Sequence, residues 1–93
     1  MTKESTAKPW FLYILRCSDD SLYTGITTDV QRRIHEHNHD KKGAKYTKSR
    51  RPVSLLRQWS YRNQSQALKA EIRFKKFRKE KKEQLIKDQS SFI

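Results

Sequence analysis

Residues 11–38, FLYILRCSDDSLYTGITTDVQRRIHEHN, decide the fold of this chain. The apolar run at 10–17 is rich in aromatic and β-branched residues and is short for a helix, so it predicts a central strand covered on both faces. Turn-forming residues follow at 18–21, and residues 22–25 return as a second strand, which together predict a hairpin. Gly25 allows either a positive φ or the close approach of another group to the backbone.

A helix is predicted directly after the hairpin. Thr28 and Gln31 match a capping box, and Asp29 suits the positive end of a helix dipole, so the helix should begin near Asp29. Arg33 and His37 lie four residues apart on this helix, beside its apolar stripe. Two polar side chains are therefore predicted at the border of the core.

The second half of the chain predicts one further strand and two further helices. Residues 38–52 form a long polar connection, which in a small domain is usually functional. Residues 53–59 alternate as a strand does, and a helix follows at about 65–78. The apolar pair at 85–86 predicts a last short helix that docks on the core.

The helix at 65–78 carries an acidic side chain on its apolar face. Asn63 and Gln66 predict its capped start. Glu71 stands within a stripe whose apolar members are Ala67, Ala70, Phe74 and Phe77. A carboxylate that faces a core is costly unless a cation or hydrogen-bond donor pairs with it, so we expect Glu71 to have a partner.

The formal net charge of +12 on 93 residues favours a polyanionic partner. Nucleic acid is the first expectation, and an anionic membrane surface, a solubility role or a basic ribosome-associated protein are the alternatives. Cys17 is the only cysteine, which excludes an intramolecular disulfide and a cysteine-built zinc site. The sequence shows neither a secretory signal nor a transmembrane run, so we expect a cytoplasmic protein. We also expect a monomer.

The order and spacing of these motifs resemble the GIY-YIG nuclease family. Residues 11–13, FLY, stand for a degenerate first tripeptide and residues 23–25, YTG, for the second; the helix motif RRIHEH and the segments GAKYTKSRRP and AEIRFKK follow. The run at 17–38 is especially similar to small single-domain bacterial members. The resemblance implies an α/β fold of the α+β type, a small three-stranded antiparallel β-sheet flanked by about three α-helices. We expect this single domain to span 9–88, with tails at 1–8 and 89–93.

Carried over by position, the resemblance implies five site residues. Tyr13 and Tyr23 match the two motif tyrosines, and Arg33 matches the essential arginine of the helix. His37 stands where relatives have tyrosine or histidine, and Glu71 matches the carboxylate that holds one divalent metal ion, Mg²⁺ or Mn²⁺. Some relatives carry an asparagine about a dozen residues after this glutamate, where the present chain has lysine and glutamate.

These residue types suit phosphodiester hydrolysis. A metal ion on Glu71 would polarise a phosphoryl oxygen, and the planar fork of Arg33 would bind non-bridging oxygens. Either Tyr13 or His37 would accept the proton of the attacking water, while Tyr23 orients water or phosphate. A single carboxylate predicts a one-metal mechanism.

Two alternatives concern the same residues. Glu71 could form a salt bridge with Arg33 and hold no metal. His35, Glu36 and His39 satisfy the H-E-x-x-H signature of zinc proteases, but the polar residues between them, the short chain and its charge disfavour a protease.

The polar connection predicts a nucleic-acid-binding surface with salt-sensitive affinity and little base readout. Tyr46 is expected to stack on a base. The cationic residues expected to contact phosphates are Lys41, Lys42, Lys45, Lys48, Arg50, Arg51 and Lys75.

The sequence therefore predicts a metal-dependent endonuclease that hydrolyses phosphodiester bonds in DNA, with RNA as an alternative polymer. We expect it to be directed by branched or single-stranded structure, with little sequence specificity unless a partner protein supplies it. The alternative is a non-catalytic nucleic-acid-binding module on the GIY-YIG scaffold. The pathway, whether DNA repair, recombination or defence, is left open.

Overall fold

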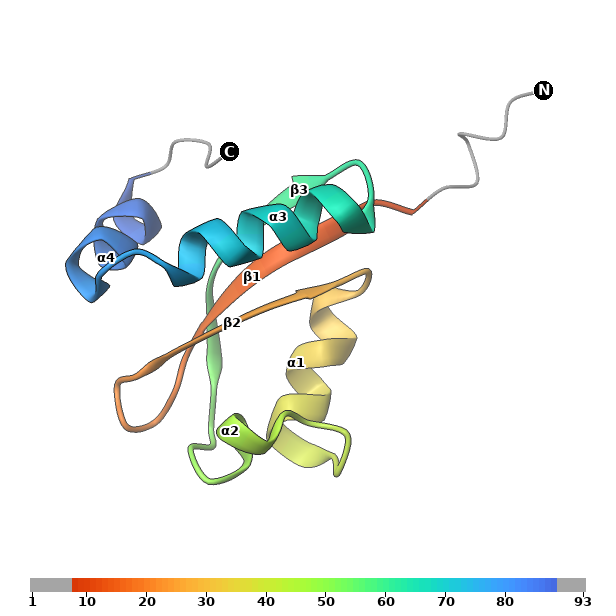
Figure 1. The fold of residues 1–93 in the computed structure, drawn as a ribbon. Coiled ribbons are helices and arrows are strands. Elements are labelled where there is room, and N and C mark those ends of the chain that lie inside the picture. Colours follow the sequence, from red (N-terminus) through yellow and green to blue (C-terminus); the bar gives the residue numbers. More distant parts are fainter. Residues whose placement is uncertain (1–7, 89–93) are drawn as a thin grey trace.

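A computed structural model describes residues 8–88; the predicted tails at 1–8 and 89–93 lie outside this range except for Lys8, which is exposed. The described part holds one antiparallel three-stranded sheet and four helices, the predicted α+β fold with one helix more than expected (Figure 1). None of the helices in this range is long and apolar enough to cross a lipid bilayer. The elements are β1 (Trp10–Arg16), β2 (Leu22–Thr27), α1 (Val30–His39), α2 (Lys45–Lys48), β3 (Ser54–Tyr61), α3 (Gln64–Lys75) and α4 (Lys79–Lys87).

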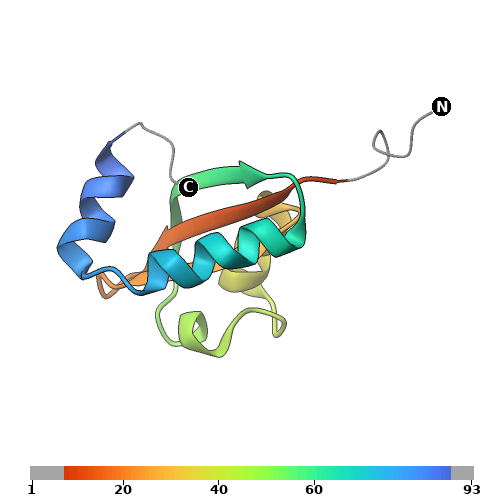
Figure 2. The same cartoon turned by 45° about the horizontal axis from the view of Figure 1, so that its top comes forward.

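β1 is the middle strand of the order β2-β1-β3, and both of its faces are covered. Leu12 and Ile14 point to one face, where they pack with Phe74 of α3. Tyr13 and Leu15 point to the other face, which α1 covers. Figures 1 and 2 show α3 and α1 on opposite sides of the sheet. The unbroken apolar run of β1 is thus explained by burial on both sides, as the sequence predicts.

The hairpin between β1 and β2 is confirmed. Its turn contains Asp20 at a positive φ of 71° and is held by the Asp19 carboxylate, which accepts a hydrogen bond from the Ser21 N–H. In the sheet, Gly25 pairs with Tyr13. A Cβ at Gly25 would lie 2.6 Å from the Tyr13 hydroxyl oxygen, and the φ of Gly25 is not positive. Of the two roles expected for Gly25, close approach is therefore the one the fold uses.

The predicted start of α1 is correct to one residue, but the predicted capping box is wrong. Asp29, and not Thr28, is the N-cap, because the Asp29 carboxylate accepts a hydrogen bond from the Arg32 N–H at 3.1 Å. The helix accordingly begins at Val30, one residue later than a Thr28–Gln31 box would place it.

The second half agrees with the expected order of elements, with shifted ends. The polar connection at 38–52 contains the short helix α2, and β3 runs two residues beyond the predicted 53–59 strand. Asn63 caps α3 by accepting a hydrogen bond from the Gln66 N–H at 2.9 Å, as expected. The helix predicted over 65–78 ends earlier, at the last residue of α3, and the chain turns there into α4.

The expected last short helix is α4, which has nine residues and lies beyond the end of α3 (Figure 2). It has no fully buried residue, and Leu85 and Ile86 are partly buried against the α3-side core. A bidentate ion pair adds to this contact, because both terminal nitrogens of Arg16 donate to the Glu83 carboxylate, at 2.7 and 2.9 Å. Charge and apolar contact therefore share the task of holding α4 on the sheet.

Glu83→Gln is expected to loosen α4 without unfolding the domain, since it removes the charge that Arg16 binds. Hydrogen exchange of the amides at 79–87 should accelerate, and the free energy of unfolding should fall by about 1 kcal/mol. Glu80→Gln, an exposed change on the same helix, is the matched control. Equal exchange in both variants would mean that Leu85 and Ile86 alone hold α4.

Candidate active site

Four of the five predicted site residues come together on the α1 side of the sheet. Tyr13 extends from β1, Tyr23 from β2, and Arg33 and His37 from α1. The ring centroids lie 6.4 Å apart for Tyr13 and Tyr23, 5.9 Å for Tyr13 and His37, and 5.0 Å for Tyr23 and His37. The two motif tyrosines and the helix histidine therefore form one aromatic cluster.

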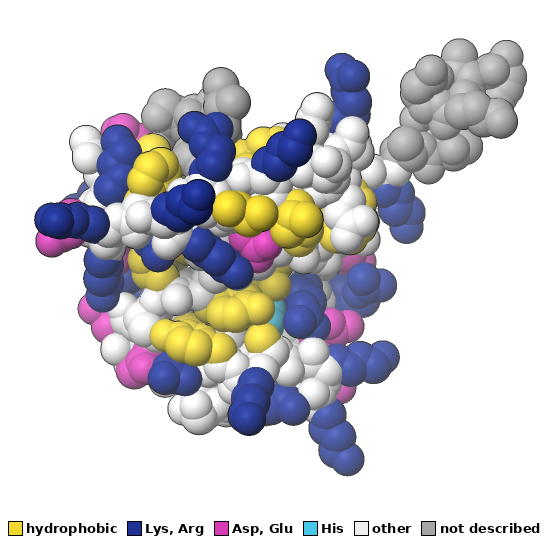
Figure 3. Space-filling model, in the orientation of Figure 1, with side chains coloured by type: hydrophobic (Ala, Val, Ile, Leu, Met, Phe, Trp, Pro, Cys, Tyr) yellow, Lys and Arg dark blue, Asp and Glu magenta, His cyan; other side chains and the backbone are white. Residues whose placement is uncertain are grey.

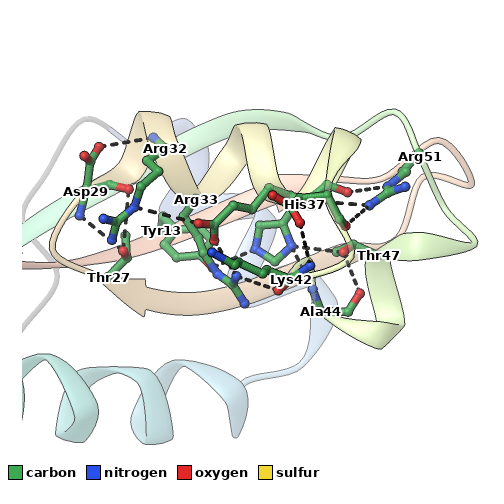
Figure 4. Close-up of polar contacts among 12 residues, drawn as sticks. Tyr13, Thr27, Asp29, Arg32, Arg33, His37, Lys42, Ala44, Thr47 and Arg51 are labelled. Carbon is green, nitrogen blue, oxygen red and sulfur yellow. Dashed lines mark hydrogen bonds and ion pairs between the residues drawn. The ribbon is translucent and has the colours of Figure 1, made fainter.

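A chain of hydrogen bonds runs through this cluster from β1 to α2 (Figure 4). The Tyr13 hydroxyl lies 2.9 Å from His37 Nε2, and His37 Nδ1 lies 2.9 Å from the Thr47 hydroxyl. That hydroxyl donates to the carbonyl oxygen of Ala44 at 2.9 Å. Thr47 has one proton to donate, so it accepts from Nδ1–H, and Nε2 is left to accept from Tyr13. The Ala44 N–H contact to Nδ1, which needs the opposite tautomer, is longer at 3.4 Å.

The protonation states at neutral pH follow from burial. Burial, and next the charge of Arg33, lower the pKa of His37 to about 4, so this side chain is neutral. Burial, and next the neighbouring Tyr23, raise the pKa of Tyr13, which therefore keeps its proton. The resting pair is a phenol donating to a neutral imidazole.

Arg33 is oriented by two acceptors on its own side of the sheet. One terminal nitrogen lies 2.8 Å from the Glu36 carboxylate and donates at 2.8 Å to the carbonyl oxygen of Lys42 (Figure 4). The nearby Arg33 guanidinium lowers the pKa of the Tyr13 hydroxyl and partly offsets the effect of burial. The guanidinium thus faces the cluster, and 26% of the side chain remains exposed.

Glu71 approaches the cluster from α3, on the other side of the sheet. Its side chain is 14% exposed and pairs with Lys75 at 3.2 Å. Its partner Lys75 lines the same hollow as Tyr23, and the carboxylate charge is the smallest of the contributions that raise the pKa of Tyr13. The alternative in which Glu71 pairs with Arg33 is wrong, because Arg33 binds Glu36 instead.

The donor set around Glu71 suits a hard cation that keeps most of its waters. The residues at 8–88 contain no group of three or more His, Cys, Asp or Glu side chains that could hold a metal. A protein-built zinc cage is therefore not formed there. Mg²⁺ by contrast is commonly bound through one or two carboxylates, water and substrate phosphate, and a half-buried carboxylate fits that role.

The H-E-x-x-H residues do not form a protease site. His35 and His39 lie on the exposed side of α1, with ring centroids 4.7 Å apart. Glu36, the residue that would serve as base, is held by Arg33.

The predicted nucleic-acid-binding residues lie around α2 and at the end of α3. Tyr46 is 40% exposed, and its ring centroid is 6.0 Å from that of Tyr23. Arg50 lies over the Tyr46 ring at 3.9 Å, and the Arg51 guanidinium donates to carbonyl oxygens at the end of α1. The exposed lysines of this surface are Lys41, Lys42, Lys45, Lys48 and Lys75.

A hollow of about 240 Å³ adjoins the aromatic cluster at the outer side of β2. Figure 3 shows lysine and arginine side chains spread around the acidic and hydrophobic centre of this face. The residues that line the hollow are Leu22, Tyr23, Thr24, Tyr46, Lys75 and Lys82.

Two residues near the site are not identified by the sequence. Lys82 lines the hollow but stands in a long basic run, and the role of Thr47 depends on α2, which the sequence does not predict.

The model of the GIY-YIG catalytic domain matches residues 9–85. The chain belongs to the GIY-YIG family. GIY-YIG domains are nuclease domains that generally use a divalent metal, so hydrolysis of nucleic-acid phosphodiesters is the general activity of the family.

The GIY-YIG relatives include small proteins of similar length. A UPF0213 protein of Desulfotalea psychrophila is 48% identical over 84 residues, which cover 90% of this chain and 76% of the relative. A UPF0213 protein of Bacillus velezensis is 50% identical over 78 residues, covering 84% and 78%.

Two solution NMR structures share the fold. The UPF0213 protein BH0048 from Bacillus halodurans is 45% identical, with a TM-score of 0.55 and coverage of 84% of this chain and 82% of that one. The protein EF2693 from E. faecalis is 42% identical, with a TM-score of 0.58 and coverage of 84% and 83%.

The buried neutral His37 predicts a stability that falls as the pH falls from about 6.5 to 4. In this window the unfolded chain binds a proton at this residue and the folded chain does not. The slope should be about 1 kcal/mol per pH unit, measured by urea unfolding at a series of pH values. His37→Gln should remove this slope and His35→Gln, at an exposed site, should keep it; equal slopes in all three proteins would contradict the assignment.

Proposed function

We propose that this GIY-YIG protein is a metal-dependent endonuclease that cuts DNA and reads strand structure more than sequence. One observation carries the proposal. A buried phenol on β1 is hydrogen-bonded to a neutral histidine on α1, and the carboxylate of Glu71 on α3 pairs with Lys75, which lines the same hollow as Tyr23. An acid, a phenol, a base and a guanidinium that converge from three elements, α3, β1 and α1, suit hydrolysis better than binding alone.

Glu71 is the residue that would hold a single Mg²⁺ or Mn²⁺ ion. When bound, the ion supplies Lewis-acid polarisation of the phosphoryl oxygen and offsets the charge that develops on it. The ion would also stabilise the buried carboxylate, because the cation takes the place of the water that burial removes from it.

Arg33 would bind the non-bridging oxygens of the scissile phosphate. Its contacts with Glu36 and with the carbonyl oxygen of Lys42 hold the guanidinium in position before substrate arrives. Both contacts involve the same terminal nitrogen, so the other terminal nitrogen can face a phosphate oxygen. A lysine would carry the charge without this two-sided geometry.

Tyr13 and His37 would act together as the proton acceptor. As water attacks phosphorus, the Tyr13 oxygen takes the water proton and passes its own proton to His37 Nε2, 2.9 Å away. The bond from the water oxygen to phosphorus forms while the bond to the leaving oxygen breaks, and the leaving oxygen takes its proton from solvent water. The imidazolium is stabilised because Nδ1–H keeps its hydrogen bond to Thr47. A phosphate bound by Arg33 would offset the guanidinium charge that lowers the pKa of His37.

Single-stranded or branched DNA is the substrate that the surface favours. Tyr46 exposes an aromatic ring beside Tyr23, and exposed lysines flank it. Bases stack on such a ring when they are unpaired, and lysine binds phosphate without regard to sequence. Tyr23, at the wall of the hollow, would orient the water or the phosphate. RNA shares this chemistry and belongs in the same assay, and base specificity would have to come from a partner protein.

Glu71→Gln and Arg33→Lys should each reduce cleavage of a single-stranded oligonucleotide in Mg²⁺ or Mn²⁺ by at least about 100-fold, because each removes stabilisation of the transition state. Glu80→Gln, on exposed α4, is the control and should cleave normally. Salt-dependent binding should persist in Glu71→Gln. Wild-type protein that binds DNA and never cuts branched, single-stranded or duplex substrates would favour the non-catalytic binding module.

Tyr46→Leu should weaken binding of single-stranded DNA by about 5- to 100-fold and leave duplex binding nearly unchanged, because only unpaired bases reach the ring. Lys48→Gln is the matched comparison on the same helix. It should weaken binding of both DNA forms equally. The slope of log affinity against log salt concentration should fall in magnitude by about one, because one phosphate contact is lost. Fluorescence anisotropy at a series of salt concentrations measures both, and an equal loss for the two DNA forms in Tyr46→Leu would exclude stacking.

A further inference from the structure

Lys75 belongs to two parts of the site at once. Its ammonium nitrogen lies 3.2 Å from a carboxylate oxygen of Glu71, one helical turn earlier on α3. Its side chain also lines the 240 Å³ hollow, together with Tyr23, Tyr46 and Lys82. A single flexible side chain therefore reaches both the carboxylate and the hollow.

The ion pair between Lys75 and Glu71 engages one of the two oxygens of the carboxylate that a metal ion would need. In the part of the chain that the structure describes, Lys75 is the one cation paired with this carboxylate. A divalent ion and an ammonium group repel each other when both lie beside one carboxylate, so each lowers the affinity of that carboxylate for the other. The metal and Lys75 must therefore compete for Glu71.

We propose that Lys75 is a two-position residue, which caps the Glu71 carboxylate before a metal binds and moves to a DNA phosphate in the adjoining hollow afterwards. The inference rests on the proposed function, since it takes Glu71 as the metal ligand. It adds a role that metal binding alone does not imply, because the displaced ammonium becomes a phosphate contact.

The structure supports both positions of the side chain. The side chain of Lys75 is 55% exposed, so its pair with Glu71 is partly solvated and easily exchanged. Lys75 is the last residue of α3, where the hollow begins, and rotation of its side chain requires no movement of the backbone. Lys82 lines the same hollow from α4, and a phosphate there would meet two ammonium groups.

The two positions couple metal binding to DNA binding. A metal ion that displaces Lys75 frees a cation for phosphate, and a phosphate that draws Lys75 away frees the carboxylate for metal. Each ligand must then raise the affinity of the other by the same factor. Before DNA is bound, Lys75 holds the affinity for metal down.

Binding of Mn²⁺ alone, followed by electron paramagnetic resonance of the free ion, tests the first position without any cleavage. Lys75→Gln should bind Mn²⁺ about three- to tenfold more tightly than the wild type, because a competing cation is removed. Lys69→Gln, an equal loss of charge at an exposed α3 position, should change the affinity by less than about twofold. An unchanged or weaker affinity in Lys75→Gln, or an equal gain in Lys69→Gln, would overturn the inference.

A second background separates this inference from the proposed function. In Glu71→Gln the effect of Lys75→Gln on Mn²⁺ affinity should vanish, since the negative charge for which the two cations compete is gone. If Glu71→Gln binds Mn²⁺ as the wild type does, the assignment of Glu71 as metal ligand fails, and the inference fails with it. If Glu71→Gln loses Mn²⁺ but Lys75→Gln gains nothing, the proposed function stands and the inference alone is refuted.

The second position is tested by a single-stranded oligothymidylate in a Tyr13→Phe background, which the proposed function expects not to cleave. Anisotropy measures the factor by which Mn²⁺ tightens DNA binding. This factor should be at least about twofold larger in the protein that keeps Lys75 than in the one that also carries Lys75→Gln. An equal factor in the two proteins would show that Lys75 does not move to the phosphate.

Discussion

Tyr13 reaches His37 because Gly25 leaves the space beside its hydroxyl unfilled. The phenol lies across the neighbouring strand, and any side chain at that position would occupy the space its oxygen takes. The imidazole is in turn held from behind by Thr47 of α2. The two buried hydrogen bonds of His37 thus join the central strand to two helices, and the bond to Thr47 fixes the tautomer of the histidine.

The charges of the site are arranged around this neutral pair. The chain carries a net charge of +12. The two acids near the site, Glu36 and Glu71, are largely removed from water by burial. Glu36 orients Arg33. Glu71 instead pairs with Lys75, whose long and partly exposed side chain can rotate away from the carboxylate. Burial lowers the pKa of His37 most, and the positive charges of Arg33 and Arg51 lower it further, so the imidazole is uncharged.

The sequence predicts most of the fold because its signals are local. The apolar run of β1, the turn at 18–21 and the Asn63 cap each depend on neighbours in the chain, and all three are confirmed. The capping box at Thr28 is wrong because two adjacent residues can cap, and only the backbone geometry chooses between them.

The site is less accessible to prediction because it is built from contacts distant in the chain. The resemblance supplies Tyr13 and Glu71, but not the relay through Thr47, which requires a helix of four residues inside a polar connection. Arg33 and Glu71 pair with Glu36 and Lys75, which lie three and four residues away on the same helix, a spacing that the sequence does contain. What the sequence does not contain is that α1 and α3 cover opposite faces of the sheet, which keeps Arg33 and Glu71 from pairing with each other.

The placement of Glu71 on α3, across the sheet from the phenols, has a consequence during synthesis. A nascent chain that has emerged only as far as α2 already holds the tyrosines, the arginine and most of the basic surface, but it lacks the acid. The proposed metal ligand joins the other residues of the site only when β3 has paired with β1 and α3 covers the sheet, so the site is complete only in the finished fold.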